Sequence, residues 1–182
     1  MSPQDQNYFY KFLAENNAVL WPSWFDGEPP EAVWREIEDN LKLVPDEWKY
    51  CFLRNGKKVV LVYRHPITWH PEAAHLRGQT VPGDGRAWDA IAGTVVHNTI
   101  VRADLLNYNG TVNLLLHEMG HALDILHGWS NREDVRAAAL KYASRRATNA
   151  TEYVAELKAR VALGRPLEPD EAALNALIPV TK

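Results

Sequence analysis

The segment HEMGHALDILHG, residues 117–128, constrains the fold of this chain more than any other stretch of its sequence. His117 and His121 are four residues apart, so on a helix they share one face and can bind the same metal ion. Glu118 is offset by one residue and can reach a water molecule at the open position of that ion. Zinc lowers the pKa of such a water to about 7, and a neighbouring carboxylate then accepts its proton. The segment therefore predicts a zinc-binding helix, and the fold has to bring a third ligand to it.

His127 is the nearest candidate for the third ligand, because its spacing is that of the metzincin pattern HExxHxxGxxH. That pattern needs a glycine where this chain has Asp124, since the backbone has to leave the helix and turn sharply. On an unbroken helix, His127 lies about 15 Å beyond His117 along the axis and about 80° off its face. We therefore expect His127 not to be a ligand. Asp124 becomes a candidate for supporting a ligand histidine instead.

A second acidic motif follows in TNATEYVAE, residues 148–156. Glu152 and Glu156 are four residues apart, so they share one face of a predicted helix. One carboxylate can bind zinc while the other accepts a hydrogen bond from the second ring nitrogen of a ligand histidine. We expect Glu152 to be the third ligand and Glu156 to orient a histidine.

The stretches LLLHEMGHALD and TNATEYVAE together resemble the gluzincin metallopeptidases of the anthrax lethal factor catalytic-domain type, which include the Pro-Pro endopeptidases. The resemblance covers about residues 88–163, where IAGTVVHNTIVRA is similar to the strands that precede the zinc helix in that family. It implies an α+β, zincin-like fold in which a small mixed sheet places an edge strand over the zinc-binding helix. It also implies one Zn2+ ion with these residue roles: ligands His117, His121 and Glu152, base Glu118, and supporting carboxylate Glu156.

The side chain that steadies the oxyanion is less well specified. The family resemblance implies a tyrosine seven residues before the ligand glutamate, where this chain has Arg145. Tyr142 lies one turn earlier and is the candidate that we carry forward as a catalytic residue. Arg145 is an alternative, since its cation could stabilise a developing negative charge.

An extended protein or peptide is the expected substrate, because peptidases of this build add the substrate as a strand to a sheet edge. TVVHNTIVRA, residues 94–103, is the candidate edge strand. His97 and Asn98 interrupt its apolar pattern, so we expect these two side chains to face the substrate cleft.

The remaining elements follow from apolar spacing and from turn residues. Asn55-Gly56 within residues 48–64 is the strongest signal for a β-hairpin, and residues 91–106 predict one or two strands. Thr111 is a plausible N-cap for the zinc helix, with Gly128 as its stop, and Ser130 with Glu133 forms a capping-box pattern. Apolar spacing and capping predict helices at 4–16, 30–44, 112–127, 131–146 and 150–163, and a short one after Pro169. The layout is a mixed N-terminal region, 1–87, packed on the same domain as a catalytic core, 88–182, whose C-terminal half is helical.

Composition limits the partners and the compartment. The chain has 182 residues, 46 % of them hydrophobic and 24 % charged, which suits a folded protein with a real core. Its net charge is −3 and it has no basic stripe, so nucleic acid is not an expected partner. No stretch approaches the roughly 20 apolar residues of a membrane span, and the N-terminus lacks the features of a Sec signal. A cytoplasmic location is the default, while export by another route or as a mature fragment stays open. The oligomeric state is not predicted.

Three functions are compatible with these patterns. The first is a zinc-dependent endopeptidase that hydrolyses peptide bonds with a metal-activated water. The second is a regulatory HExxH peptidase of the type that cleaves phage repressors. The third is a catalytically silent module of a phage or toxin assembly that binds zinc only for stability.

Overall fold

A computed structural model describes residues 3–21, 29–107, 111–143 and 149–180 of the chain. Its strands are β1 (Ala18–Trp21), β2 (Val59–Val62), β3 (Gly93–Val95) and β4 (Thr99–Arg102). Its α-helices are α1 (Pro3–Glu15), α2 (Glu31–Lys42), α3 (Asp46–Arg54), α4 (Leu114–His127), α5 (Glu133–Ala143), α6 (Ala150–Ala162) and α7 (Pro169–Leu177). Short 3-10 turns are η1 (Ile67–Trp69), η2 (Pro71–Leu76), η3 (Trp88–Ala90), η4 (Ala103–Leu105) and η5 (Trp129–Asn131).

The four strands form one mixed sheet in the order β1-β2-β4-β3. β1, β2 and β4 run parallel, whereas β3 pairs antiparallel with β4, with Thr94 opposite Ile100. This order makes β3 an edge strand. β3 packs against α4, a helix that comes later in the chain. The predicted α+β class with a small mixed sheet is confirmed.

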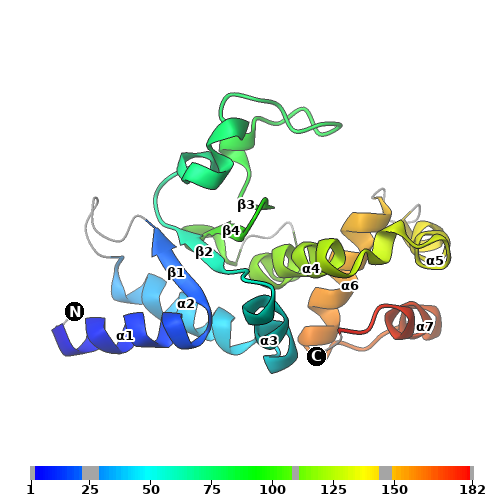
Figure 1. Ribbon diagram of the computed structural model, residues 1–182, viewed down its shortest axis with the longest axis horizontal. Helices are drawn as coiled ribbons and strands as arrows, with labels where there is room; N and C mark the ends of the chain where they lie inside the picture. The colour runs from blue at the N-terminus through cyan, green and yellow to red at the C-terminus, as the bar shows by residue number, and fades with distance from the viewer. Residues whose placement is uncertain (1–2, 22–28, 108–110, 144–148, 181–182) are drawn as a thin grey trace.

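Both faces of the sheet are covered, which explains why β2 reads VVLV and is buried along its whole length. Val59 and Leu61 belong to the main hydrophobic core, together with apolar side chains of the helices. Val60 and Val62 face the other way and pack under residues 64–91, the segment between β2 and β3 that we call the arm. Figure 1 shows the arm standing above the sheet, with the helices on the opposite side and to one end.

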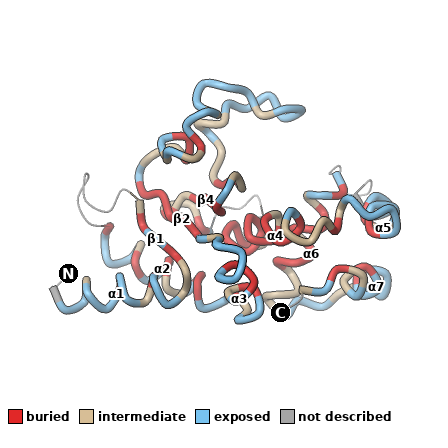
Figure 2. The backbone as a smooth tube through the Cα atoms, viewed as in Figure 1, coloured by how far each residue is buried: buried red, intermediate tan, exposed pale blue. Residues whose placement is uncertain are grey.

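The main core runs through the middle of the chain and reaches both ends, from Phe9 in α1 to Ile178 after α7. Figure 2 shows buried residues along β2, β4, α4 and α6, whereas the outer end of the arm and the outward sides of the other helices are exposed. The C-terminal half beyond β4 is helical, as predicted, and α4 and α6 lie side by side within it. In the described residues, no helix is long and apolar enough to cross a membrane.

The predicted β-hairpin around Asn55-Gly56 is wrong. Residues 46–54 form helix α3, and Asn55 ends it, with its backbone N–H donating to the carbonyl oxygens of Cys51 and Phe52. Gly56 has φ 62°, a left-handed conformation typical of the residue after a helix. Trp48 and Phe52 are buried one helical turn apart, so the apolar residues of this stretch have helical spacing despite their β-rich composition.

Two predicted helix starts also need correction. The N-cap of α4 is Asn113 rather than Thr111, because the Asn113 side chain accepts the hydrogen bond from the Leu116 N–H. The helix after it begins at Glu133, with the 3-10 turn η5 before it, so Ser130 does not cap it. Gly128 ends α4 with φ 64°, as predicted.

Candidate metal centre and cleft

Helix α4 holds the two histidines in a rigid frame. Asn113 caps its N-terminus and donates a hydrogen bond from Nδ2 to Asn40 Oδ1 at 2.6 Å, which ties the start of α4 to α2. Leu115, Leu116 and Leu123 are fully buried and fix the rotation of the helix. Their positions leave His117 and His121 on the side of α4 that faces α6, because residues four apart share a face.

Helix α6 supplies the acidic side of the site. Asn149 caps it, accepting a hydrogen bond from the Glu152 N–H at 2.9 Å. The two helices approach so closely at Gly120 that an added methyl group would lie 2.8 Å from the Ala155 carbonyl oxygen. Glycine at this position therefore allows α6 to bring Glu152 and Glu156 within reach of the histidines.

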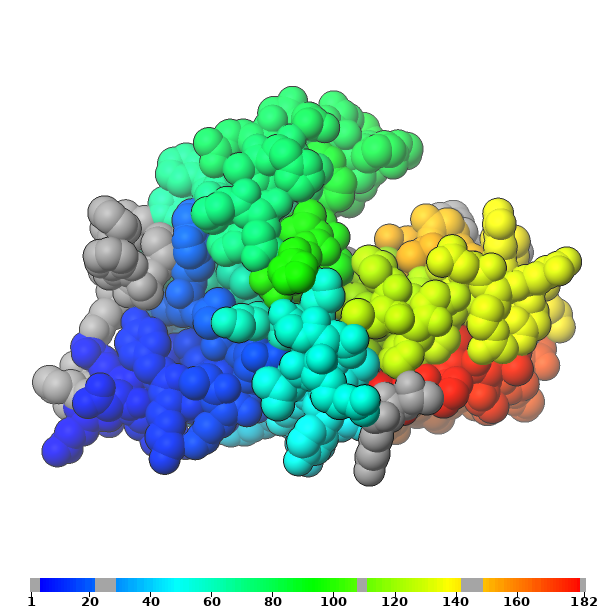
Figure 3. Space-filling view, viewed as in Figure 1, coloured from blue at the N-terminus to red at the C-terminus, as the bar shows by residue number. Residues whose placement is uncertain are grey.

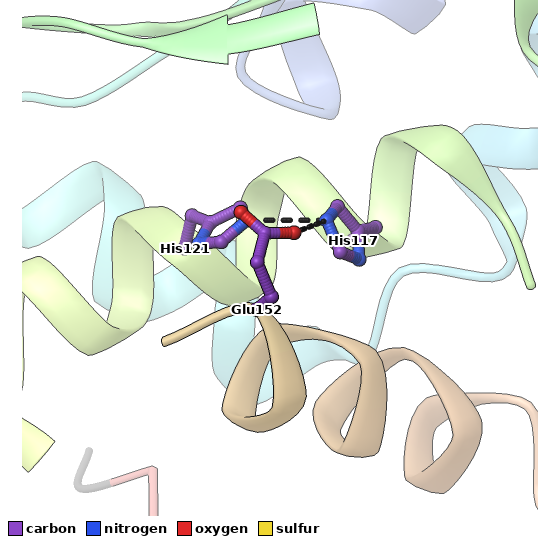
Figure 4. Close-up of side chains that lie close together, drawn as sticks. All are labelled: His117, His121 and Glu152. Carbon is purple, nitrogen blue, oxygen red and sulfur yellow. Dashed lines mark hydrogen bonds and ion pairs between the residues drawn. The ribbon is translucent and has the colours of Figure 1, made fainter. Parts of the chain in front are cut away.

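Three side chains converge between the helices, as Figure 4 shows. Glu152 Oε2 lies 3.2 Å from His117 Nε2, and Glu152 Oε1 lies 3.3 Å from His121 Nε2. The two Nε2 atoms are 3.1 Å apart. A tetrahedral ion with bonds of about 2.0–2.2 Å keeps its ligand atoms roughly 3.3–3.6 Å from one another. His117, His121 and Glu152 can therefore hold one metal ion with little movement.

Glu156 lies behind His117. Its Oε2 is 3.4 Å from His117 Nδ1, a contact too poorly aligned to count as a hydrogen bond. Nδ1 is buried and has no hydrogen-bond partner among the described residues, so the carboxylate of Glu156 that faces it can accept its proton. With Nδ1 directed at Glu156, Nε2 stays available for a metal, which is the arrangement expected of a ligand histidine.

The charges of the site stabilise one another. Burial opposes protonation of His117, but Glu152 and Glu156 outweigh it and raise the pKa of His117 to about 9. Hydrogen bonds from His117 and His121 lower the pKa of Glu152. Burial raises the pKa of Glu118, while the nearby charges of the two histidines oppose that rise. Glu118 is thus a buried carboxyl group whose proton affinity is increased by its surroundings, as a general base requires.

Glu118 rests against the edge strand. A methyl group added at Gly93 of β3 would lie 2.6 Å from Glu118 Cγ and 2.8 Å from its Cδ and Oε1. The missing side chain at Gly93 therefore makes the space that the Glu118 carboxyl occupies beside the two histidines.

A cleft of about 600 Å³ opens over the site. Its walls come from β3, from the end of the arm, from the exposed side of α4 and from the start of α6. Its lining includes Asp84, Arg86, Trp88, Gly93, Thr94, Val95, Leu105, Leu114, His117, Glu118, His121, Ile125, Asn149, Thr151 and Glu152. Figure 3 shows the arm projecting over this open side of the molecule.

The two residues predicted to face the substrate cleft from the edge strand, His97 and Asn98, lie outside that cleft. His97 and Asn98 are in the turn between β3 and β4 rather than in the edge strand, and neither lines the cleft. Asn98 accepts a hydrogen bond from the Lys58 N–H at 2.7 Å and donates one from Nδ2 to Glu72 at 2.7 Å. Asn98 therefore links the turn between β3 and β4 to the arm and to the start of β2 through hydrogen bonds. This role explains why a polar residue interrupts the apolar pattern of residues 94–103.

Two other polar residues of α4 have structural contacts. Asp124 accepts a hydrogen bond from the Ser130 N–H at 2.7 Å, so its carboxylate organises the turn after the helix instead of supporting a histidine. His127 Nε2 lies 3.6 Å from Cys51 Sγ, and its ring stacks on Trp129 with centroids 4.8 Å apart. His127 therefore has packing partners away from the three converging ligands, as its place on an unbroken helix predicts. The Tyr142 side chain and Arg145 lie outside the described residues.

Three contributors to the site were not predicted from the sequence: Gly93, Ile125 and the part of the arm that lines the cleft. Each acts through proximity between segments that are distant in sequence, which no local spacing reveals. The turn glycines at 83 and 85 indicate a loop in the arm, but they do not indicate that it reaches the cleft.

Comparison with known proteins supports the fold. No protein-family model matches the sequence, and no curated protein matches it. The chain is similar to the solved structure of the Pro-Pro endopeptidase PPEP-2 from Paenibacillus alvei, with a TM-score of 0.64 and 24 % sequence identity. The match covers 93 % of this chain and 95 % of that one, so the two chains share their fold over nearly their whole length. The predicted zincin-like architecture is thereby confirmed.

Proposed function

We propose that this protein is a zinc-dependent endopeptidase. The observation that carries the proposal is the convergence of His117, His121 and Glu152 within 4.8 Å of one another, next to a buried Glu118 and under an open cleft. The fold shared with a protein described as an endopeptidase supports the same reaction class.

The donor set favours zinc. Two imidazole nitrogens and one carboxylate, with the fourth side open to a cleft, are typical of catalytic rather than structural zinc sites. When bound, zinc acts as a Lewis acid that polarises a carbonyl group and lowers the pKa of a water molecule. The buried Nδ1 of His117, which faces Glu156, supports this choice, because ligand histidines direct their second nitrogen at a carboxylate.

Glu118 is the general base of the proposed reaction. It is buried beside both histidines and held against Gly93, so its carboxyl group stays directed toward the metal side of the cleft. Its carboxylate can accept a proton from water and then pass that proton to the leaving amine. Glu156 does not line the cleft; its carboxylate faces His117 Nδ1 at 3.4 Å and would orient the His117 ring.

The edge strand β3 offers the substrate a backbone to pair with. Ala92 O accepts the Arg102 N–H at 2.8 Å and the Val96 N–H donates to Asn98 O at 3.1 Å, so residues 92 and 96 turn their polar groups toward β4. Because backbone groups alternate along a strand, those of Gly93 and Val95 point away from β4. An extended peptide can pair with these groups and pass directly over Glu118.

Digestion of an unbiased peptide library tests the proposal. We expect the zinc-loaded protein to cleave internal peptide bonds. We expect Glu118→Gln to bind one zinc per chain and to lose cleavage by at least a hundredfold, since general-base groups contribute about 10²–10⁴ in rate. Equal cleavage by Glu118→Gln would refute the role of this base. One bound zinc without cleavage of any peptide would favour the catalytically silent module instead.

A further inference from the structure

Ile125 is exposed at a position where the helix that carries the metal ligands is otherwise largely buried. Its side chain is 62 % exposed, whereas α4 is buried continuously from Leu114 to Gly120 and again from Ala122 to Asp124. Ile125 also lines the cleft over the metal centre. An isolated surface isoleucine is unremarkable, but one on the wall of a substrate cleft offers apolar surface to whatever the cleft binds.

The position of Ile125 on α4 relates it to the metal. His117, His121 and Ile125 follow one another at intervals of four residues, so Ile125 lies one turn beyond His121 and about 40° round the helix from it, on the side that lines the cleft. At 1.5 Å per residue, Ile125 lies about 9 Å along the axis from the midpoint of the two histidines.

An extended peptide advances about 3.3 Å per residue, so a reach of about 9 Å corresponds to two or three residues from the scissile bond. The substrate residue at that point would face Ile125. Among the exposed large hydrophobic side chains in the described ranges, Ile125 alone lines this cleft. The charged cleft residues Asp84 and Arg86 form an ion pair with each other, and Glu118 and Glu152 belong to the metal centre.

We propose that Ile125 forms a specificity subsite that selects a large apolar side chain two or three residues from the scissile bond. This inference rests on the proposed endopeptidase function and adds a preference to it. The substrate class is an extended polypeptide with leucine, isoleucine, valine, methionine or phenylalanine at that position. Burial of such a side chain against Ile125 contributes to binding in the cleft, whereas a charged residue there loses its hydration without gaining a partner.

Positional profiling of cleavage tests the subsite. Wild-type protein is expected to prefer large apolar residues at one position two or three residues from the cleaved bond. Ile125→Lys is expected to lower kcat/KM for peptides with leucine there by about 10- to 100-fold, the usual range for a mismatched apolar subsite. The same variant is expected to raise the relative rate for peptides with aspartate or glutamate at that position only. Ile125→Glu is expected to shift the preference toward lysine and arginine.

Leu53→Lys is the matched control, because Leu53 is 63 % exposed on α3 and does not line the cleft. It adds the same charge to an equally exposed apolar site, and we expect it to leave the cleavage profile unchanged. One zinc bound per chain in every variant shows that the metal centre is intact. Cleavage by Ile125→Lys with the wild-type profile would overturn the subsite and leave the endopeptidase function standing. Failure of the wild-type protein to cleave any peptide would overturn both.

Discussion

Substitution of Gly120 with alanine tests whether the close packing of α4 on α6 sets the geometry of the metal site. The added methyl group would lie 2.8 Å from the Ala155 carbonyl oxygen and 2.9 Å from Ala155 Cα. Carbon atoms in good contact are about 3.5–4.0 Å apart, so the helices have to separate by roughly 0.6–1 Å. Metal ligands hold their distances within about 0.2 Å. A separation of this size therefore moves Glu152 out of its bonding position relative to His117 and His121.

The expected magnitude follows from the cost of overpacking, which is about 1–3 kcal/mol for an extra methyl group in a tight core. If binding of zinc restores the original helix spacing, that strain weakens zinc binding by about 5- to 150-fold, since about 1.4 kcal/mol corresponds to a factor of ten. Helix propensity alone predicts something different. Alanine is favoured over glycine in a helix by about 1 kcal/mol, which stabilises the metal-free protein and leaves zinc affinity unchanged.

Zinc titration in competition with a chromophoric chelator measures the affinity directly, and thermal unfolding of the metal-free protein measures stability. Glu152→Gln provides the reference for loss of the third ligand. We expect Gly120→Ala to bind zinc more weakly than wild type and more tightly than Glu152→Gln. A zinc affinity within twofold of wild type, together with a higher unfolding temperature, would refute the packing argument.

Three further outcomes are expected. Gly93→Ala displaces the Glu118 carboxyl, so kcat falls by tenfold or more while zinc affinity stays within twofold; an unchanged kcat in steady-state kinetics would contradict this. Glu156→Gln frees the ring of His117 and weakens zinc binding by about 10- to 100-fold in a chelator competition, and wild-type affinity would argue against a supporting role. Burial alone would raise the pKa of Glu171, but its hydrogen bonds to side chains of α6 lower it from 4.5 to about 2. Glu171 therefore stabilises the fold by up to about 3 kcal/mol above pH 4.5, and this contribution is lost as the pH falls toward 2. Urea unfolding should show Glu171→Gln destabilised at pH 7 and equal to wild type near pH 2, and a difference independent of pH would be inconsistent with this linkage.

The helices that carry the candidate ligands were predictable because their signals are local. His117, His121, Glu152 and Glu156 each follow a four-residue spacing, and the stop at Gly128 follows from the need for a left-handed residue. The structure brings the first three together and places the fourth behind a histidine, as that spacing implies. The exclusion of His127 follows from helix geometry together with Asp124 in place of the metzincin glycine.

The remaining features depend on tertiary contacts. Asn98 was predicted to be a cleft residue because it interrupts an apolar run. Its side chain instead forms hydrogen bonds with Lys58 and Glu72, which are distant in sequence. The aromatic and apolar run at residues 48–54 predicts a strand, yet its burial follows a helical period. The need for glycine at position 93 cannot be predicted from the sequence, because it arises from the Glu118 side chain that fills the space beside it. Local patterns predict elements and ligands, whereas the walls of the cleft come from the packing of separate segments.

Hydrolysis measured against added zinc tests the central claim most directly. The protein is stripped with a chelator, zinc is returned in known fractions of an equivalent, and cleavage of a peptide identified in the library is followed for wild type and Glu118→Gln. We predict that wild-type activity rises in proportion to zinc and reaches its maximum at one equivalent. Glu118→Gln should take up the same single equivalent and remain at least a hundredfold slower. Cleavage by the stripped protein, or equal rates in the two proteins at one equivalent of zinc, would contradict the account.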